Sequence, residues 1–172
     1  MEGKKYKRKE FISFLQEVVS DFANPSVKLE QYMTPYDVTA DFFALLNDTG
    51  EITGKVVADF CCGTGLYTAA SYFLDAKEVY AFDIDKEALS LCMASTEELK
   101  GCEFHIESID LTTSAITEKY TQQFDTVVMN PPFGTKSNKG IDMTLLKNAI
   151  KVLLLNKTNS VVREMYIPCI RQ

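Results

Sequence analysis

The chain has 172 residues, 46% of them hydrophobic and 24% charged, which is typical of one globular domain and excludes a disordered or fibrous chain. A chain of this length buries roughly 70% of the surface that its unfolded form exposes, so its core needs no disulfides or structural metal. The net charge of −6, from 18 basic and 24 acidic side chains, argues against nucleic-acid binding through bulk charge alone.

The sequence also excludes several kinds of site. No stretch approaches the ~20 apolar residues of a membrane helix, and the N-terminus lacks the apolar core of a signal peptide, so we expect an intracellular protein that binds no membrane. Five cysteines, with Cys61 and Cys62 adjacent, form neither a disulfide framework nor a CxxC zinc pair. The only histidine, His105, lies in an apolar stretch and is expected to be structural. No metal site is predicted.

The N-terminal region is predicted to be helical over about residues 8–47. Apolar residues recur at a spacing of three to four across 9–23, and Asn24-Pro25 is expected to end that amphipathic helix. A second helix is predicted over 35–46, where Thr34 and Asp37 resemble a capping box. Five of the basic residues lie in the first nine positions, and they fit either a phosphate-contacting arm or a solvated end: Lys4, Lys5, Lys7, Arg8 and Lys9.

From about residue 55 to 155 the pattern changes to alternating strands and helices. Short apolar runs typical of buried parallel strands lie at 56–60, 78–82, 102–106 and 124–130. Helices are predicted at 66–74 and from Asp85, as its N-cap, through Leu99. The order predicts an α/β fold with a Rossmann-like, doubly wound parallel sheet, helices on both faces and right-handed crossovers, within a single domain over 1–172.

Three chain segments are expected to meet where ligands bind in such sheets, at the carboxyl ends of the strands. The first is the turn Asp59-Phe60-Cys61-Cys62-Gly63-Thr64-Gly65, whose glycines bring backbone N–H groups close to a ligand. The second is Asp83, 18 residues beyond Gly65, near the spacing at which an acid accepts hydrogen bonds from ribose hydroxyls. The third is Asp110, which could hold an adenine amino group and taken alone equally fits a helix cap.

Together these residues specify a cofactor that contains adenosine. A dinucleotide is disfavoured because the third glycine of its fingerprint is replaced by Thr68, and because Asp59 would repel a pyrophosphate. An acid at that position suits a cationic ligand, such as the aminoacyl-sulfonium end of S-adenosylmethionine.

The most specific motif is Asn130-Pro131-Pro132-Phe133, which follows the fourth predicted strand. An exocyclic base amine is a poor nucleophile because its lone pair is delocalised into the ring, so a methyltransferase must orient it with hydrogen-bond acceptors. The Asn130 side-chain oxygen and the Pro131 carbonyl are such acceptors, the prolines hold the backbone rigid, and Phe133 offers a face for the extruded base.

These motifs resemble the class I S-adenosylmethionine-dependent amino-methyltransferases. The chain is most similar to the methyltransferase-like protein 5 family, which methylates N6 of one adenosine in small-subunit ribosomal RNA. The similarity runs from about residue 8 to about residue 150 and is carried by residues 29–35, 55–59, 82–85 and 124–136.

The resemblance implies specific roles and partners. Cofactor contacts are expected ahead of the sheet, in the glycine turn and after the second and third strands: Gln31, Thr34, Asp59, Cys61, Gly63, Thr64, Gly65, Leu66, Asp83, Asp110 and Leu111. The target-base site would comprise Asn130, Pro131, Pro132 and Phe133. The family also implies a small zinc-containing activator subunit as a heterodimer partner, and a location in the nucleus and cytoplasm.

Two features depart from the family pattern. Cys61 replaces the first glycine of the turn, where a side chain demands an unfavourable φ and weakens cofactor binding. After the predicted helix from Asp142, Leu153 to Lys157 resembles a remnant of the fifth strand, residues 156–172 are unassigned, and we expect the last strands of the sheet to be missing.

These departures leave alternatives open. A non-catalytic truncated chain could bind the activator or RNA without methyl transfer. An enzyme could instead methylate another planar amine or amide, such as DNA adenine or protein glutamine, because the same acceptors suit those groups.

Overall fold

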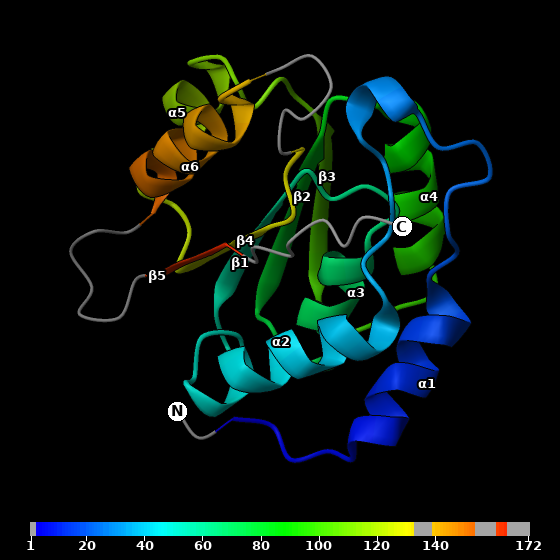
Figure 1. Cartoon of the computed structure of the whole chain (residues 1–172). Coiled ribbons are helices and arrows are strands. Elements are labelled where there is room, and N and C mark those ends of the chain that lie inside the picture. Colours follow the sequence, from blue (N-terminus) through cyan, green and yellow to red (C-terminus); the bar gives the residue numbers. More distant parts are fainter. Residues whose placement is uncertain (1–2, 133–138, 154–160, 165–172) are drawn as a thin grey trace.

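A parallel sheet organises the computed structural model, which describes residues 3–132, 139–153 and 161–164 (Figure 1). Its five strands lie in the order β3-β2-β1-β4-β5, and every neighbouring pair is parallel. The strands are β1 (Val56–Phe60), β2 (Glu78–Asp83), β3 (Glu103–Ser108), β4 (Thr126–Met129) and β5 (Val161–Glu164). The predicted α/β, Rossmann-like class is confirmed.

Helices cover both faces of this sheet. They are α1 (Arg8–Val18), α2 (Tyr36–Asp48), α3 (Leu66–Phe73), α4 (Lys86–Thr96), α5 (Ala115–Lys119) and α6 (Ile141–Val152), with a 3-10 turn at Val27–Leu29. Figure 1 shows α1 to α4 on one side of the sheet and α5 with α6 on the other. None of the helices in the described ranges is long and apolar enough to cross a membrane.

The period of two along each strand divides the core between these layers. Val57, Val79 and Val128 pack with α1, α2 and α3, whereas the alternate residues Phe60 and Phe82 pack in a cluster that includes residues of α5 and α6. All five side chains are fully buried, and each contributes roughly 1.5–3 kcal/mol to folding through the area it removes from water.

The first helix is shorter than predicted. It ends at Val18, and Val19 is already extended with φ −113° and ψ 121°. The Val19 carbonyl accepts a hydrogen bond of 2.8 Å from the Tyr36 hydroxyl at the start of α2. Because the Tyr36 hydroxyl satisfies the Val19 carbonyl, this carbonyl needs no partner within a longer helix, and α1 ends before Asn24-Pro25.

The predicted capping box at the start of α2 is wrong. Pro35 is the N-cap, and no side chain caps the helix. The Thr34 hydroxyl lies 3.3 Å from the Tyr67 hydroxyl and accepts a hydrogen bond from the Asn130 amide, so it is committed to the interior rather than to the helix end. At α4, by contrast, the Asp85 side chain accepts from the Glu87 amide as predicted.

The fifth strand lies later in the chain than expected. We predicted its remnant at Leu153–Lys157, but β5 begins at Val161, within the tail that sequence patterns left unassigned, and pairs with β4. Leu153 is buried and makes an isolated bridge to Phe124, while 154–160 are outside the described residues. The β-branched Val161-Val162 pair favours a strand at the observed position.

Two of the N-terminal basic residues serve the fold. Lys4 donates to the Phe73 carbonyl and to Asp75, at 2.5 and 3.0 Å. Arg8 makes a two-pronged pair with Asp41 at 2.7 and 3.0 Å, and this carboxylate raises the pKa of the guanidinium through hydrogen bonding. Lys4 and Arg8 thus pair within the fold, whereas the sequence left open both a phosphate-contacting arm and a solvated end.

Gly65 is required where the β1 turn enters α3. Its φ is +87°, and a Cβ atom there would lie 2.8 Å from the Cys92 Sγ atom and 3.1 Å from the Cys92 Cα atom of α4. A side chain at this position would therefore strain the backbone and separate α3 from α4.

We expect Gly65→Ala to lower the free energy of unfolding by about 2–4 kcal/mol, because left-handed strain adds to overpacking. Gly101→Ala is the matched control, since Gly101 has φ +88° with nothing within 4 Å of the position that a Cβ atom would take, and should cost only about 1 kcal/mol. Urea unfolding measures both, and equal losses would contradict the role of packing against Cys92.

Candidate functional site

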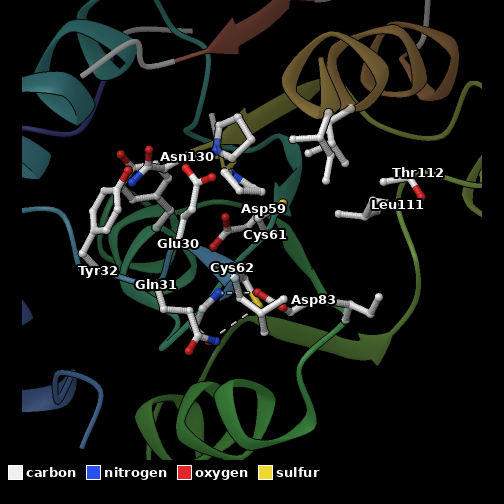
Figure 2. Close-up of a pocket in the computed structure, with 18 of the residues that line it drawn as sticks. Glu30, Gln31, Tyr32, Asp59, Cys61, Cys62, Asp83, Leu111, Thr112 and Asn130 are labelled. Carbon is white, nitrogen blue, oxygen red and sulfur yellow. Dashed lines mark hydrogen bonds between the residues drawn. The ribbon is translucent and has the colours of Figure 1, made fainter. Parts of the chain in front are cut away.

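The strand register brings three loops to one level at the carboxyl edge of the sheet. Phe60 of β1 is aligned with Phe82 of β2 and Met129 of β4. The residues that follow them, Cys61, Asp83 and Asn130, therefore leave the sheet side by side, as parallel strands require. They line a cavity of about 530 Å³ (Figure 2).

This cavity collects almost the whole predicted site. Every predicted residue that the structure describes lines it except Gly65, which packs on α4 instead: Gln31, Thr34, Asp59, Cys61, Gly63, Thr64, Leu66, Asp83, Asp110, Leu111, Asn130, Pro131 and Pro132. Phe133 is outside the described residues. In Figure 2, Gln31 and Tyr32 lie on one side of the cavity and Leu111 with Thr112 on the other, with Asp59 and Asp83 between them.

The glycine turn and Asp83 form one hydrogen-bonded unit. The Gly63 amide donates to Asp83 Oδ2 at 2.9 Å, and the Asp85 amide donates to Asp83 Oδ1 at 3.0 Å. Burial raises the pKa of the Asp83 carboxyl despite these donors. The amides thus fix the carboxylate at the edge of the cavity, and its remaining lone pairs can accept from a ligand.

Cys61 carries the strain that the sequence predicted. Its φ is +60°, in the left-handed region that glycine adopts without cost. Its thiol lines the cavity, and burial followed by the charges of Asp83 and Asp59 raises the pKa of that thiol well above its usual value. The thiol is therefore neutral and unreactive at physiological pH.

Asp59 is a buried acid on the floor of the cavity. Its side chain accepts a hydrogen bond of 2.8 Å from the Thr68 hydroxyl, and the residue is 1% exposed. Burial, with a smaller effect of the nearby Asp83 charge, raises the pKa of Asp59 to about 7. A cation beside Asp59 would stabilise its ionised form, so the two acids together favour a positively charged ligand.

The segment before α2 closes one wall of the cavity. The Gln31 side-chain amide donates to Asp85 at 2.6 Å, and its oxygen accepts from the Ser26 amide at 2.8 Å. Both ends of the Gln31 side chain are thus occupied within the protein. Gln31 positions the wall that carries Thr34 and Tyr32 along the cavity.

The opposite wall is the loop after β3. Asp110 Oδ1 accepts from both the amide and the hydroxyl of Thr112, at 2.9 and 2.6 Å, which is a local turn rather than a helix cap. The buried Asn148 of α6 donates to the Leu111 carbonyl at 2.8 Å. This bond anchors the loop beside the cavity.

Asn130 has one satisfied and one unsatisfied polar atom. Its Nδ2 atom donates to the Thr34 hydroxyl at 3.1 Å. Its Oδ1 atom is buried and has no hydrogen-bond partner among the described residues. An unpartnered buried acceptor costs about 1–3 kcal/mol, so this atom is suited to receive an N–H group from a ligand.

Several lining residues were not predicted from the sequence: Phe22, Tyr32, Tyr67, Cys62, Ile84, Thr112 and the α6 residues Ile141, Thr144 and Leu145. Ile84 had a usable signal in the sequence, because it follows directly after the end of a predicted strand, where ligands bind in such sheets. In the structure it lines the cavity and is 55% exposed. Tyr67 had none, since it lies within an apolar helix pattern that is typical of core.

Among the described residues, side chains that could bind a metal ion lie close together only at the opposite end of the sheet. Glu78, Glu103 and His105 place ligand atoms within 4.8 Å of one another. Glu78 pairs with Lys77 at 2.7 Å, and His105 Nε2 lies 3.5 Å from Glu103 Oε1. The His105 ring also stacks on Tyr80 at 4.1 Å, in the structural role that the sequence predicted.

Comparisons with known proteins agree with this geometry. The family model described as "Methyltransferase small domain" matches residues 36–168. The rRNA N(6)-adenosine-methyltransferase METTL5 of Danio rerio is 39% identical over 163 residues, covering 90% of this chain and 76% of the relative. The Drosophila melanogaster protein of the same description is 34% identical, covering 83% of this chain and 69% of the relative.

A solved structure has the same fold. It is that of a Pyrococcus horikoshii protein described as a candidate RNA methyltransferase, and it matches with a TM-score of 0.74 and 35% sequence identity. The match covers 85% of this chain and 69% of that structure.

The raised pKa of Asp59 predicts how stability changes with pH. Because this pKa rises on folding, from the usual 3.8 to about 7, ionisation opposes folding as pH increases between these values. The free energy of unfolding of the wild type should therefore fall relative to that of Asp59→Asn by up to ~4 kcal/mol between pH 4 and 7. Above pH 7 the difference between the two proteins should stay constant. Urea unfolding at several pH values measures the difference.

Thr68→Val is the matched variant for this effect. It removes the hydroxyl that stabilises the ionised carboxylate, so the midpoint of the stability change should move to higher pH. A difference between Asp59→Asn and the wild type that stays constant with pH would contradict the assignment.

Proposed function

This chain belongs to the methyltransferase small domain family and, within it, to the METTL5 rRNA N6-adenosine methyltransferases, and we propose that it methylates N6 of an adenosine in small-subunit ribosomal RNA. The observation that carries the proposal is the buried, unpartnered Oδ1 atom of Asn130 in the cavity wall. An exocyclic amine presents the N–H group that this acceptor lacks.

The methyl donor that we propose is S-adenosylmethionine, which supplies an electrophilic methyl group when bound. The residues present fit such a ligand. Asp83 would accept hydrogen bonds from ribose hydroxyls, since its carboxylate offers more acceptor sites than the Gly63 and Asp85 amides use. Asp59, whose ionisation a nearby cation favours, lies where a sulfonium and an ammonium group would be stabilised.

The amine side of the site orients a weak nucleophile. The Asn130 Oδ1 atom would accept one N–H of the target amine and the Pro131 carbonyl the other. These two acceptors, one of them on the rigid Pro131-Pro132 backbone, would draw the N–H bonds out of the ring plane, so that the nitrogen lone pair is less delocalised into the ring and available to the methyl donor. A carbonyl or ether oxygen at the same place would face the Asn130 oxygen and be repelled, which gives the site its preference for amines.

Two substitutions separate the cofactor site from the amine site. Asp83→Ala should weaken the binding of S-adenosylmethionine at least about tenfold, because it removes charged hydrogen bonds. Asn130→Ala should leave that affinity within about twofold of the wild type while lowering the methyl transfer rate roughly a hundredfold. Calorimetric titration and a transfer assay on a ribosomal RNA fragment measure the two effects.

The outcomes distinguish the alternatives. Loss of cofactor binding in both variants would indicate a collapsed cavity rather than separate roles. Absence of binding to the folded wild-type chain would exclude the proposed donor and favour the non-catalytic form. Transfer to DNA adenine or to protein glutamine in preference to RNA would replace the proposed substrate.

Cys61 sets the efficiency of the cofactor site. Cys61→Gly removes a side chain that lines the cavity together with the left-handed strain at φ +60°, so the backbone can approach the cofactor more closely and we expect tighter binding, by about threefold to tenfold. Cys61→Ala is the control, since it keeps the Cβ atom and should not improve the affinity. Equal gains in both variants would assign the effect to the thiol instead of the backbone.

The second partner that we propose is a small zinc-containing activator subunit. Two pairs of exposed apolar side chains, each pair spanning about two helical turns, offer surfaces for a partner: Val38 with Leu45 on α2, and Met143 with Ile150 on α6 on the other side of the sheet. Co-expression with this subunit should raise the soluble yield and give a 1:1 complex in size-exclusion chromatography with light scattering. A monomeric chain in the presence of excess subunit would exclude the partner.

A further inference from the structure

The direction in which the Asn130 amide faces is set by its neighbour. An asparagine amide presents a donor on one side and an acceptor on the other, and rotation by half a turn exchanges them. Here Nδ2 donates to the Thr34 hydroxyl at 3.1 Å, which leaves Oδ1 to the cavity. The reverse orientation would present an NH₂ group to the N–H groups of an amine, a contact between donors.

Thr34 alone does not enforce this orientation. A hydroxyl both donates and accepts, so a free Thr34 hydroxyl could donate to Oδ1 as readily as accept from Nδ2. The Tyr67 hydroxyl lies 3.3 Å from the Thr34 oxygen, and either hydroxyl can donate to the other. In the arrangement in which Thr34 donates to Tyr67, Thr34 offers only lone pairs to Asn130, and only Nδ2 can satisfy them.

The rest of the fold holds Tyr67 in place. Tyr67 is 4% exposed, and its ring packs against Phe42 and Phe43 of α2, with centroid distances of 5.9 and 5.3 Å. Thr34 is 4% exposed in the segment before the same helix. Both residues line the cavity, but because each is only 4% exposed, little water competes for their hydroxyl hydrogens.

We propose that the Thr34 hydroxyl donates to Tyr67, and that Thr34 and Tyr67 are thereby positioning residues that hold the Asn130 amide with Oδ1 toward the target amine. The proposal rests on the proposed function, because it assigns how that site selects an N–H donor. It gives Thr34 a role separate from the cofactor contact expected from the sequence, and it adds Tyr67, which no sequence motif marks.

The test is the single-turnover methyl transfer rate of the full chain at saturating cofactor and RNA, measured beside the cofactor dissociation constant. Thr34→Val and Tyr67→Phe keep the side-chain shapes and remove one hydroxyl each. We expect each to lower the rate about tenfold while the cofactor dissociation constant changes less than about twofold. Thr34→Ser, which keeps the hydroxyl, should restore most of the rate.

Asn130→Asp provides the matched background. A carboxylate has two equivalent oxygens, so its orientation does not matter, and either oxygen accepts from the amine. In this background Thr34→Val should change the residual rate less than about twofold, whereas a merely structural role of Thr34 would give the same tenfold loss as in the wild type.

Each result decides the proposal. An equal loss in the wild-type and Asn130→Asp backgrounds, or weakened cofactor binding with an unchanged rate in Thr34→Val, would overturn it while leaving the proposed function intact. Absence of methyl transfer by the wild-type chain, with cofactor bound, would overturn the proposed function and this inference with it.

Discussion

The site depends on the parallel pairing of β1 with β2 and β4. This register aligns the last residues of the three strands, so Cys61, Asp83 and Asn130 emerge at one level although they are far apart in the chain. One face of the same strands packs against α2 and α3. Tyr67 lies on α3, and Thr34, which accepts a hydrogen bond from Asn130, lies just before α2. The backbone hydrogen bonds of the sheet therefore determine both the cofactor side and the amine side of the cavity.

The residues that are unfavourable for folding lie where the ligand is expected to bind. Asp59 and Asp83 both have raised pKa values, mainly because the fold buries them, and Cys61 holds a left-handed backbone beside them. The two buried acids cost folding free energy in the absence of a cation, and the backbone of Cys61 costs folding free energy whether or not a ligand is bound. A positively charged cofactor would offset the cost of the acids, which couples binding to stability in this chain.

Local sequence patterns were sufficient for the first four strands of the sheet and for most of the cavity, but not for the position of β5. Buried strands appear as short apolar runs, and the acids and amide that follow them appear as polar residues at strand ends, so β1, β2, β4, Asp83 and Asn130 were predictable. Tertiary contacts decided the rest. The end of α1 depends on Tyr36, and the orientation of Thr34 depends on Tyr67 and Asn130. The requirement for Gly65 depends on Cys92. None of these contacts can be read from the sequence of the segment that it affects.

The central claim is that the cavity delivers a methyl group to an exocyclic adenine amine held by Asn130. The most direct measurement is nucleoside mass spectrometry of small-subunit ribosomal RNA after incubation with the chain and S-adenosylmethionine that carries a deuterated methyl group. We expect the label in N6-methyladenosine, and its absence from RNA in which inosine replaces the target adenosine. Label in another nucleoside, or retained in the inosine-containing RNA, would contradict the claim.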